Sequence, residues 1–172
     1  IGLTLLTGFT YSAGAVTKDM KKVVDEALEF SVKQSMSMFN EMKDQKGILP
    51  RTAKDGKMIT CESAWWTSGF YPGSLWYCYE YSNDPQVRAA AEEMTSRVEK
   101  QKYTTSNHDV GFIINCSFGN GYRLTHNETY REVIETAAKS LSTRFHPVTG
   151  CTRSWNSKKW QFSVIIDNMM NL

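Results

Sequence analysis

Residues 68–84 read SGFYPGSLWYCYEYSND, and residues 110–127 read VGFIINCSFGNGYRLTHN. Both stretches begin with a Gly-Phe pair, at positions 69–70 and 111–112, which lie forty-two residues apart. Both end in a polar turn, at positions 79–84 and 122–127, and here the offset is forty-three. The second offset also aligns two charged positions, Arg88 with Arg131 and Glu92 with Glu135. This agreement in order and in spacing indicates an internal repeat.

Each repeat unit is predicted to be a pair of helices. The first helices, at Pro72–Tyr81 and Phe112–Leu124, are apolar and aromatic, whereas the helices that follow them are amphipathic. Asp84, followed by Pro85, and Asn127 stand where N-caps are expected. The apolar helices should therefore lie inside and the amphipathic helices outside. Repeated helical hairpins predict an all-α solenoid or a closed α/α toroid.

The flanking segments are expected to extend this helical array. Apolar residues at helical spacing predict a long amphipathic helix from Val16 to about Lys46, ended by Gly47 and Pro50 and followed by a polar loop to Met58. β-branched and aromatic residues from Thr152 to Ile166 predict a β-hairpin. Residues 167–172 then resemble the start of another inner helix. Because this chain offers no further helices to pack on them, the apolar faces of the inner helices are expected to remain partly exposed.

Composition and charge narrow the class of protein. The chain has 172 residues with 41% hydrophobic and 22% charged residues, which is typical of a globular domain. A net charge of +2 gives no reason to expect nucleic acid or a membrane surface as a partner. The three His are scattered and the four Cys lack CxxC spacing, so no metal site is predicted. Gly119-Asn120-Gly121 falls inside a helical stretch and is no phosphate-binding loop.

Residues 1–15 differ from the rest of the chain. The uncharged run Ile1–Thr10 and the small residues Ala13-Gly14-Ala15 are typical of a secretory signal peptide, although an initiator Met and a basic leading segment are lacking. The alternative is a buried N-terminal helix. The signal interpretation predicts a secreted or periplasmic protein in which disulfides are possible, with one incomplete domain at residues 16–172.

Three polar stretches should share one rim of the toroid, because each stands at the beginning of an inner helix. They are Trp65-Trp66-Thr67, His108-Asp109 and Asp167-Asn168. Two carboxylates with aromatic side chains suit proton transfer on a stacked sugar ring. Asp109 and Asp167 would serve equally well as helix caps, and His108 as a buried structural residue. The apolar neighbours of Asp167 favour a raised carboxyl pKa, as a general acid requires.

Four motifs resemble the unsaturated glucuronyl hydrolases, glycoside hydrolase family 88: Trp66–Trp76, His108–Phe112, Arg153-Ser154-Trp155 and Val164–Leu172. The resemblance implies a barrel of six helical hairpins, of which this chain would be about the first half. It implies hydrolysis of lyase-generated, glycosaminoglycan-type oligosaccharides that end in a C4=C5 unsaturated glucuronic acid, with no cofactor. By resemblance, Asp167 transfers protons, Asp109 and His108 hold the unsaturated sugar, and Trp66 and Trp155 stack on sugar rings.

Other functions are compatible with the same residues. A related unsaturated rhamnogalacturonyl hydrolase would share the barrel, and an inverting two-carboxylate glycosidase would also cleave saturated substrates. A non-catalytic helical-repeat module could bind a sugar with its aromatic rim. We expect the chain alone to be poorly stable and inactive, because half of the barrel is missing from it.

Overall fold

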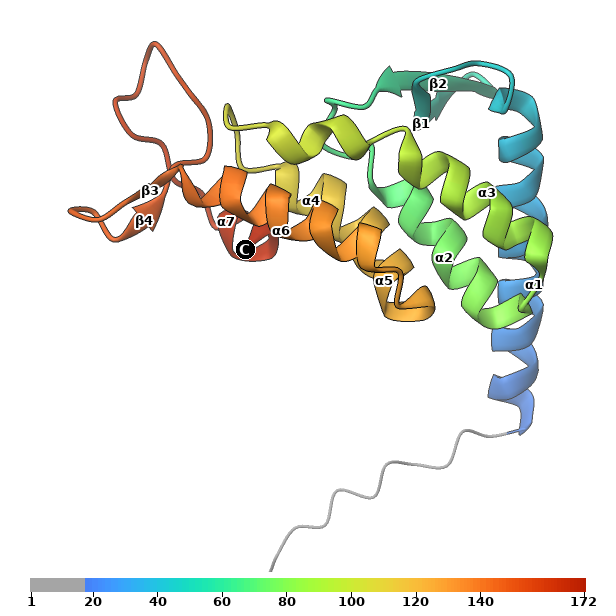
Figure 1. The fold of residues 1–172 in the computed structure, drawn as a ribbon. Coiled ribbons are helices and arrows are strands. Elements are labelled where there is room, and N and C mark those ends of the chain that lie inside the picture. Colours follow the sequence, from blue (N-terminus) through green and yellow to red (C-terminus); the bar gives the residue numbers. More distant parts are fainter. Residues whose placement is uncertain (1–17) are drawn as a thin grey trace, which may run out of the picture.

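The computed structural model describes residues 18–172, so the predicted signal peptide lies outside the described part. The helices form a row from α1 to α7 (Figure 1). Their bounds are α1 Lys18–Met42, α2 Phe70–Ser82, α3 Pro85–Ser96, α4 Val110–Ile114, α5 Asn120–Thr125, α6 Glu128–Ser142 and α7 Asn168–Asn171. Among these helices, none is long and apolar enough to cross a membrane.

The predicted first helix is confirmed as α1, and its C-terminal end is fixed by the side chain of the residue that follows α3. The guanidinium of Arg97 donates hydrogen bonds to the carbonyls of Met42, Lys43, Gln45 and Ile48, at 3.3, 3.0, 2.9 and 3.0 Å. A cation at this position stabilises the unpaired carbonyls at the end of a helix. Gly47, at φ +78°, then turns the chain away from the helix.

The prediction of a polar loop at Arg51–Met58 is wrong. Strands β1 (Ile48–Lys54) and β2 (Lys57–Glu62) form an antiparallel hairpin here. Asp55 and Gly56 connect the strands, and both have positive φ, at 51° and 71°. An Asp-Gly pair at positive φ matches the twist of a two-residue hairpin turn, so the connection stabilises the strand pairing directly. The hairpin is anchored in the core by Leu49, which is fully buried.

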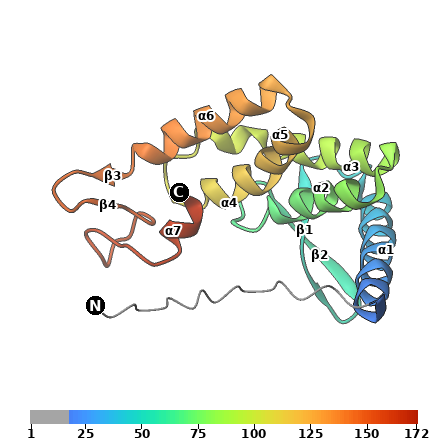
Figure 2. The same cartoon turned by 90° about the horizontal axis from the view of Figure 1, so that it is seen from below.

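The repeat is confirmed, down to its turns. Asn83 and His126 end the two inner helices in the left-handed conformation. Asp84 and Asn127 then cap α3 and α6, because their side chains accept hydrogen bonds from the backbone N–H two residues ahead. The aligned ion pairs are Arg88–Glu92 at 2.8 Å and Arg131–Glu135 at 2.9 Å. Figure 2 shows α2, α4 and α7 on one side of the row, with α3 and α6 on the other.

Between its Gly-Phe pair and its closing turn, the second repeat unit contains one residue more than the first. Between α4 and α5 the chain makes a π-helical turn, Asn115–Gly119, which keeps residues 110–125 helical throughout. A π-turn accommodates one additional residue within an α-helix. It lies between the Gly-Phe pair, where the repeat offset is forty-two, and the closing turn, where the offset is forty-three. The offset therefore changes from forty-two to forty-three because the π-turn adds one residue.

The two Gly-Phe motifs make equivalent contacts between neighbouring inner helices. A Cβ added to Gly69 would lie 2.2 Å from the carbonyl oxygen of Ile113 in α4. A Cβ added to Gly111 would lie 2.0 Å from the carbonyl oxygen of Asn171 in α7. Both glycines thus allow a close backbone approach that any side chain would prevent. Each Gly-Phe motif packs one inner helix on the next one along the row.

A short hairpin is present near the C-terminus, but not at the predicted residues. Strands β3 (Phe145–His146) and β4 (Cys151–Thr152) pair across a turn that contains Gly150, whereas residues 153–166 are mostly irregular. Within this segment one isolated β-bridge joins Trp155 to Asn107. The predicted helix after Asp167 is confirmed as α7. The four cysteines, all within the described residues, form no disulfide.

Candidate active site

His108, Asp109 and Asp167 come together where α4 and α7 begin. The Nε2 atom of His108 lies 3.2 Å from Oδ2 of Asp167 and 3.6 Å from Oδ1 of Asp109. The histidine side chain is buried, whereas 26% of the Asp109 side chain and 35% of the Asp167 side chain remain exposed. Two accessible carboxylates therefore converge on one buried imidazole.

The other ring nitrogen of His108 is held by α7. Nδ1 forms a short hydrogen bond with Oδ1 of Asn168, the residue that follows Asp167. The amide nitrogen of Asn168 donates to the carbonyl of Thr152 at 2.6 Å and to Oγ of Ser154 at 3.1 Å. The backbone N–H of His108 donates to the carbonyl of Ser154 at 2.8 Å. Asn168 and Ser154 are buried, so this network lies beneath the carboxylates.

The alternative role of the two aspartates as helix caps finds no support in the hydrogen bonds. Asp109 precedes α4 and Asp167 precedes α7, but neither side chain accepts a capping bond from the helix that follows. Both carboxylates instead face His108. Because Asp109 and Asp167 stand at the helix starts, their carboxylates lie on the rim.

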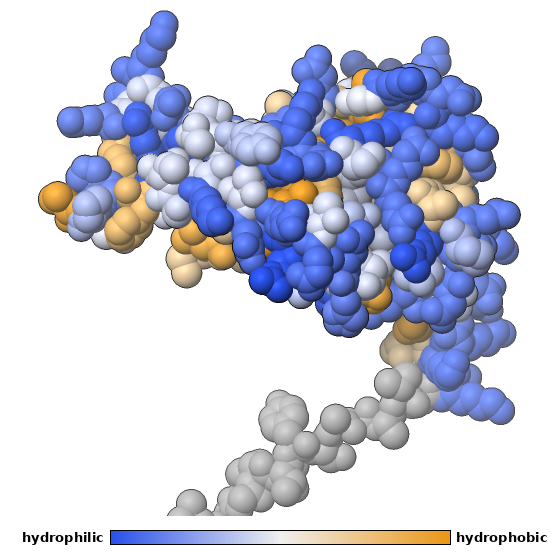
Figure 3. Space-filling model, viewed as in Figure 1, coloured by the Kyte–Doolittle hydropathy of each residue, from blue (hydrophilic) through white to orange (hydrophobic). Residues whose placement is uncertain are grey.

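The surroundings of the two carboxyl groups differ from the expectation that apolar neighbours enclose Asp167. Desolvation raises the pKa of Asp109, the nearby Asp167 raises it further, and His108 opposes the shift. The apolar neighbours of Asp167 do not bury it, because 41–45% of Val164 and Ile165 and 69–86% of Ile166, Met169 and Met170 are exposed. Figure 3, in the same view as Figure 1, shows orange, apolar surface at the end of the row where β3, β4 and α7 lie.

The two predicted stacking residues take different positions. Trp155 lies beside the cluster, with its ring 6.0 Å from the His108 ring and 39% exposed. Trp66 is also exposed and packs against Phe70 and Phe112, at ring distances of 5.7 and 6.2 Å. Since Phe112 lies in the first turn of α4, this aromatic group adjoins the helix that Asp109 precedes. Trp65 is covered by the Arg51 guanidinium at 3.8 Å, which favours Trp66 as the residue open to a ligand.

Arg144 holds the loops that carry the site, a role with no signal in the sequence. Its guanidinium donates to the carbonyls of Thr105 and Arg153, the latter at 2.7 Å. Thr105 precedes His108 in one loop, and Arg153 precedes Trp155 in the other. Desolvation, followed by repulsion from Arg153, lowers the pKa of Arg144. The side chain is buried and bonded to carbonyls, so the site is attached to the end of α6.

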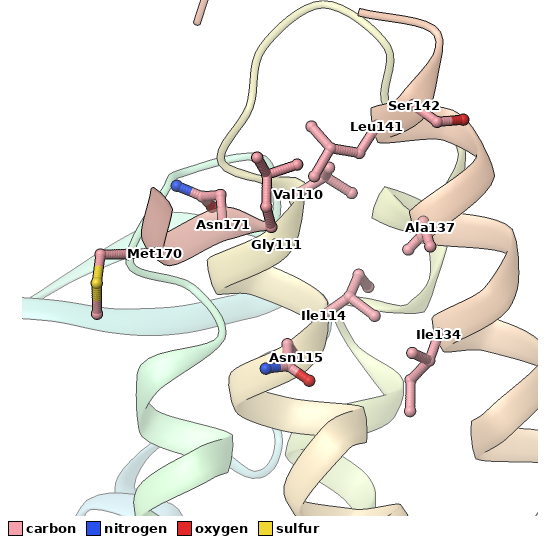
Figure 4. Close-up of a pocket in the computed structure, with 12 residues that line it drawn as sticks. Val110, Gly111, Ile114, Asn115, Ile134, Ala137, Leu141, Ser142, Met170 and Asn171 are labelled. Carbon is pink, nitrogen blue, oxygen red and sulfur yellow. The ribbon is translucent and has the colours of Figure 1, made fainter. Parts of the chain in front are cut away.

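Two further features define what the site could hold. The ligand atoms of His108, Asp109 and Asp167 lie within 4.8 Å of one another, so geometry alone would admit a cation. Between α4, α6 and α7 lies a separate pocket of about 230 Å³, lined mainly by apolar side chains such as Val110, Ile114 and Leu141 (Figure 4). No titratable side chain lines this pocket among the described residues, so it is distinct from the carboxylate cluster.

Comparison with known proteins connects these features to one family. An unsaturated glucuronyl hydrolase from Formosa agariphila is 46% identical over 110 residues, which cover 62% of this chain and 28% of the relative. An unsaturated chondroitin disaccharide hydrolase from Streptococcus pyogenes is 28% identical over 156 residues, covering 87% of this chain and 38% of the relative. No family model matches the chain.

A solved structure agrees in sequence and in fold. The crystal structure of an unsaturated glucuronyl hydrolase specific for heparin is 38% identical, with a TM-score of 0.75 over 86% of this chain and 40% of that chain. The fold of the enzyme from a Bacillus species also matches, with a TM-score of 0.71. The chain spans between 28% and 40% of the length of these relatives. In sequence identity and in fold, the chain is thus similar to unsaturated glucuronyl hydrolases over the part of their length that it spans.

Proposed function

We propose that this chain contributes the proton-transfer site of a hydrolase that removes a terminal C4=C5 unsaturated glucuronic acid from oligosaccharides. The observation that carries the proposal is the convergence of Asp109 and Asp167 on His108, with Trp155 beside them. The names of the relatives support glycosaminoglycan fragments as the substrate class, since they include a chondroitin disaccharide hydrolase and an enzyme specific for heparin.

The chemistry suits a substrate that is an enol ether. Asp167 donates a proton to C4, which leaves an oxocarbenium-like centre at C5. Water adds at C5 and returns a proton to the Asp167 carboxylate, so one group serves as acid and then as base. The resulting hemiketal opens and releases the neighbouring sugar. Asp109 and His108 bind the hydroxyls of the unsaturated ring, and Trp66 and Trp155 stack on sugar rings.

The geometry disfavours an inverting glycosidase. Such enzymes place a water between two carboxyl groups about 6.5–9.5 Å apart. Here the nearest oxygens of Asp109 and Asp167 lie within 4.8 Å of one another. Carboxylates this close leave little room for an attacking water between them, which argues against the inverting alternative.

The proposed activity is tested with a chimera that joins residues 18–172 to the segments of the Formosa agariphila relative that this chain lacks. We expect the ultraviolet absorbance of the double bond to decay on unsaturated chondroitin or heparin disaccharides. The chain alone should show no decay of this absorbance, and a saturated disaccharide, whose cleavage is followed by the release of reducing sugar, should stay intact. Faster turnover of a pectin-derived unsaturated disaccharide would favour the rhamnogalacturonyl alternative, and binding without turnover would favour a binding module.

Removal of metal ions should leave the activity of the chimera unchanged. The proton transfers require only the described side chains, and His108 already has hydrogen-bond partners on both ring nitrogens. The measurement compares kcat before and after dialysis against a chelator. A loss that is restored by one divalent cation would instead assign His108, Asp109 and Asp167 as its ligands.

We further propose that the protein is exported. The proposal rests on the apolar run and small residues of positions 1–15 in the sequence. Fractionation of cells that express the protein with residues 1–15, compared with a version that begins at Val16, tests it. Equal retention of both versions inside the cell would contradict export.

A further inference from the structure

The orientation of the Asn168 side chain is determined by its surroundings. The carbonyl of Thr152, 2.6 Å away, can only accept a hydrogen bond, so it must face the amide nitrogen of Asn168. Oγ of Ser154 lies on the same side of the amide, at 3.1 Å. Turning the amide around would bring two carbonyl oxygens together. The oxygen of Asn168 therefore faces His108.

This orientation determines which nitrogen of His108 carries a proton. Because Oδ1 of Asn168 can only accept, Nδ1 of His108 must be the donor of their hydrogen bond. A neutral His108 then has a bare Nε2 atom. Among the described residues, the polar atoms that face Nε2 are the carboxylate oxygens of Asp167 and Asp109, at 3.2 and 3.6 Å.

A bare nitrogen and an ionised carboxylate would repel each other at 3.2 Å, so the contact with Asp167 requires a proton between them. We propose that Asn168 is a positioning residue that holds His108 as its Nδ1–H tautomer, so that Nε2 and Asp167 share the proton delivered to the substrate. In the opposite tautomer, Nε2–H would donate to an ionised Asp167 and leave that carboxylate without a proton to give. This inference depends on the proposed function only in one respect, namely that the shared proton is delivered to the substrate.

The tautomer can be observed directly, without any activity. In the ¹⁵N-labelled chimera, long-range proton–nitrogen correlation spectra distinguish a protonated nitrogen from a bare one. A His108→Gln variant of the chimera identifies the signals of His108. We expect a protonated Nδ1 in the wild-type chimera. A bare Nδ1, or rapid exchange between both tautomers, would overturn the proposal.

Two asparagines one turn apart in α7 provide a matched pair of variants. Asn168→Leu removes the acceptor for Nδ1–H, so His108 should sample both tautomers and kcat of the chimera should fall by about 10- to 100-fold with KM unchanged. Asn171 is equally buried, but its Oδ1 accepts from the backbone of Phe112 at 2.8 Å. Its side-chain nitrogen donates to the carbonyl and to Oδ2 of Asp167, at 3.1 and 3.5 Å, and neither atom bonds to His108. Asn171→Leu should leave the tautomer of His108 as it is in the wild type.

The possible outcomes separate the two proposals. An unchanged tautomer in Asn168→Leu, or the same change in Asn171→Leu, would overturn the positioning role of Asn168. An inactive wild-type chimera in which His108 is the Nδ1–H tautomer would contradict the proposed function and support the hydrogen-bond assignment.

Discussion

Replacing Asp167 by Asn in the chimera is expected to lower kcat by about 10²- to 10⁴-fold, the usual contribution of a group that transfers a proton in the rate-limiting step. The amide keeps the size of the carboxyl but can neither donate a proton to C4 nor accept one from water. Because the substrate should still bind, KM is expected to change little. The measurement is the initial rate of absorbance loss over a range of disaccharide concentrations.

Two other aspartates provide the comparison. Asp109→Asn should mainly raise KM, because we assign its carboxylate to the hydroxyls of the sugar. Asp84→Asn is the neutral control, since Asp84 caps α3 and Asn caps a helix equally well. If Asp167→Asn retained wild-type kcat, or if Asp109→Asn reduced kcat more than Asp167→Asn, the assignment of the proton donor would be wrong.

Gly111→Ala is expected to destabilise the protein and to reduce activity together. The added methyl group would lie 2.0 Å from the carbonyl oxygen of Asn171, and backbone cannot move aside as a flexible side chain can. Overpacking of this kind costs about 1–3 kcal/mol. Since Asp167 and Asn168 start the helix that must shift, a displacement of about 1 Å could reduce kcat by a further 10²-fold. Thermal unfolding and the disaccharide assay measure the two effects.

Gly69→Ala tests whether the loss of activity follows from the position of α7. Its methyl group would collide with the carbonyl of Ile113 in α4, so a similar decrease in Tm is expected. Asp167 is not displaced directly, and kcat per folded molecule should fall less than in Gly111→Ala. Equal losses of kcat in both variants would show that stability alone is responsible. Wild-type Tm for Gly111→Ala would contradict the close backbone contact.

The helical repeat could be predicted because its signals are local. An N-cap, a proline at the first position and a left-handed turn are properties of four or five consecutive residues, as at Asn83-Asp84-Pro85. The hairpin at Asp55-Gly56 had an equally local signal, the Asp-Gly pair, but polar neighbours concealed the alternation of its strands. Residues 153–166, in contrast, form no strand and stay mostly irregular, although the prediction included them in a hairpin.

The site itself was predictable only in part. Asp109, Asp167 and His108 were identified from helix starts and motifs, and the fold brings them together. The support beneath them was not predictable, because it joins residues far apart in the chain. Asn168 reaches His108 across sixty positions, and Arg144 reaches Thr105 across thirty-nine. Contacts over such separations depend on the packing of helices, which no local pattern encodes.

The π-turn at Asn115–Gly119 bears on how this chain could have diverged from a repeated ancestor. One extra residue in a regular helix would rotate everything beyond it by about 100° and carry buried side chains to the surface. Confined to a wide turn, the insertion leaves the Gly-Phe contact with α7 at one end and the Asn127 cap at the other in their repeat positions. The two ends of the helix are therefore free to evolve separately. The rim that carries Asp109 can be selected for chemistry while the opposite rim is selected for folding.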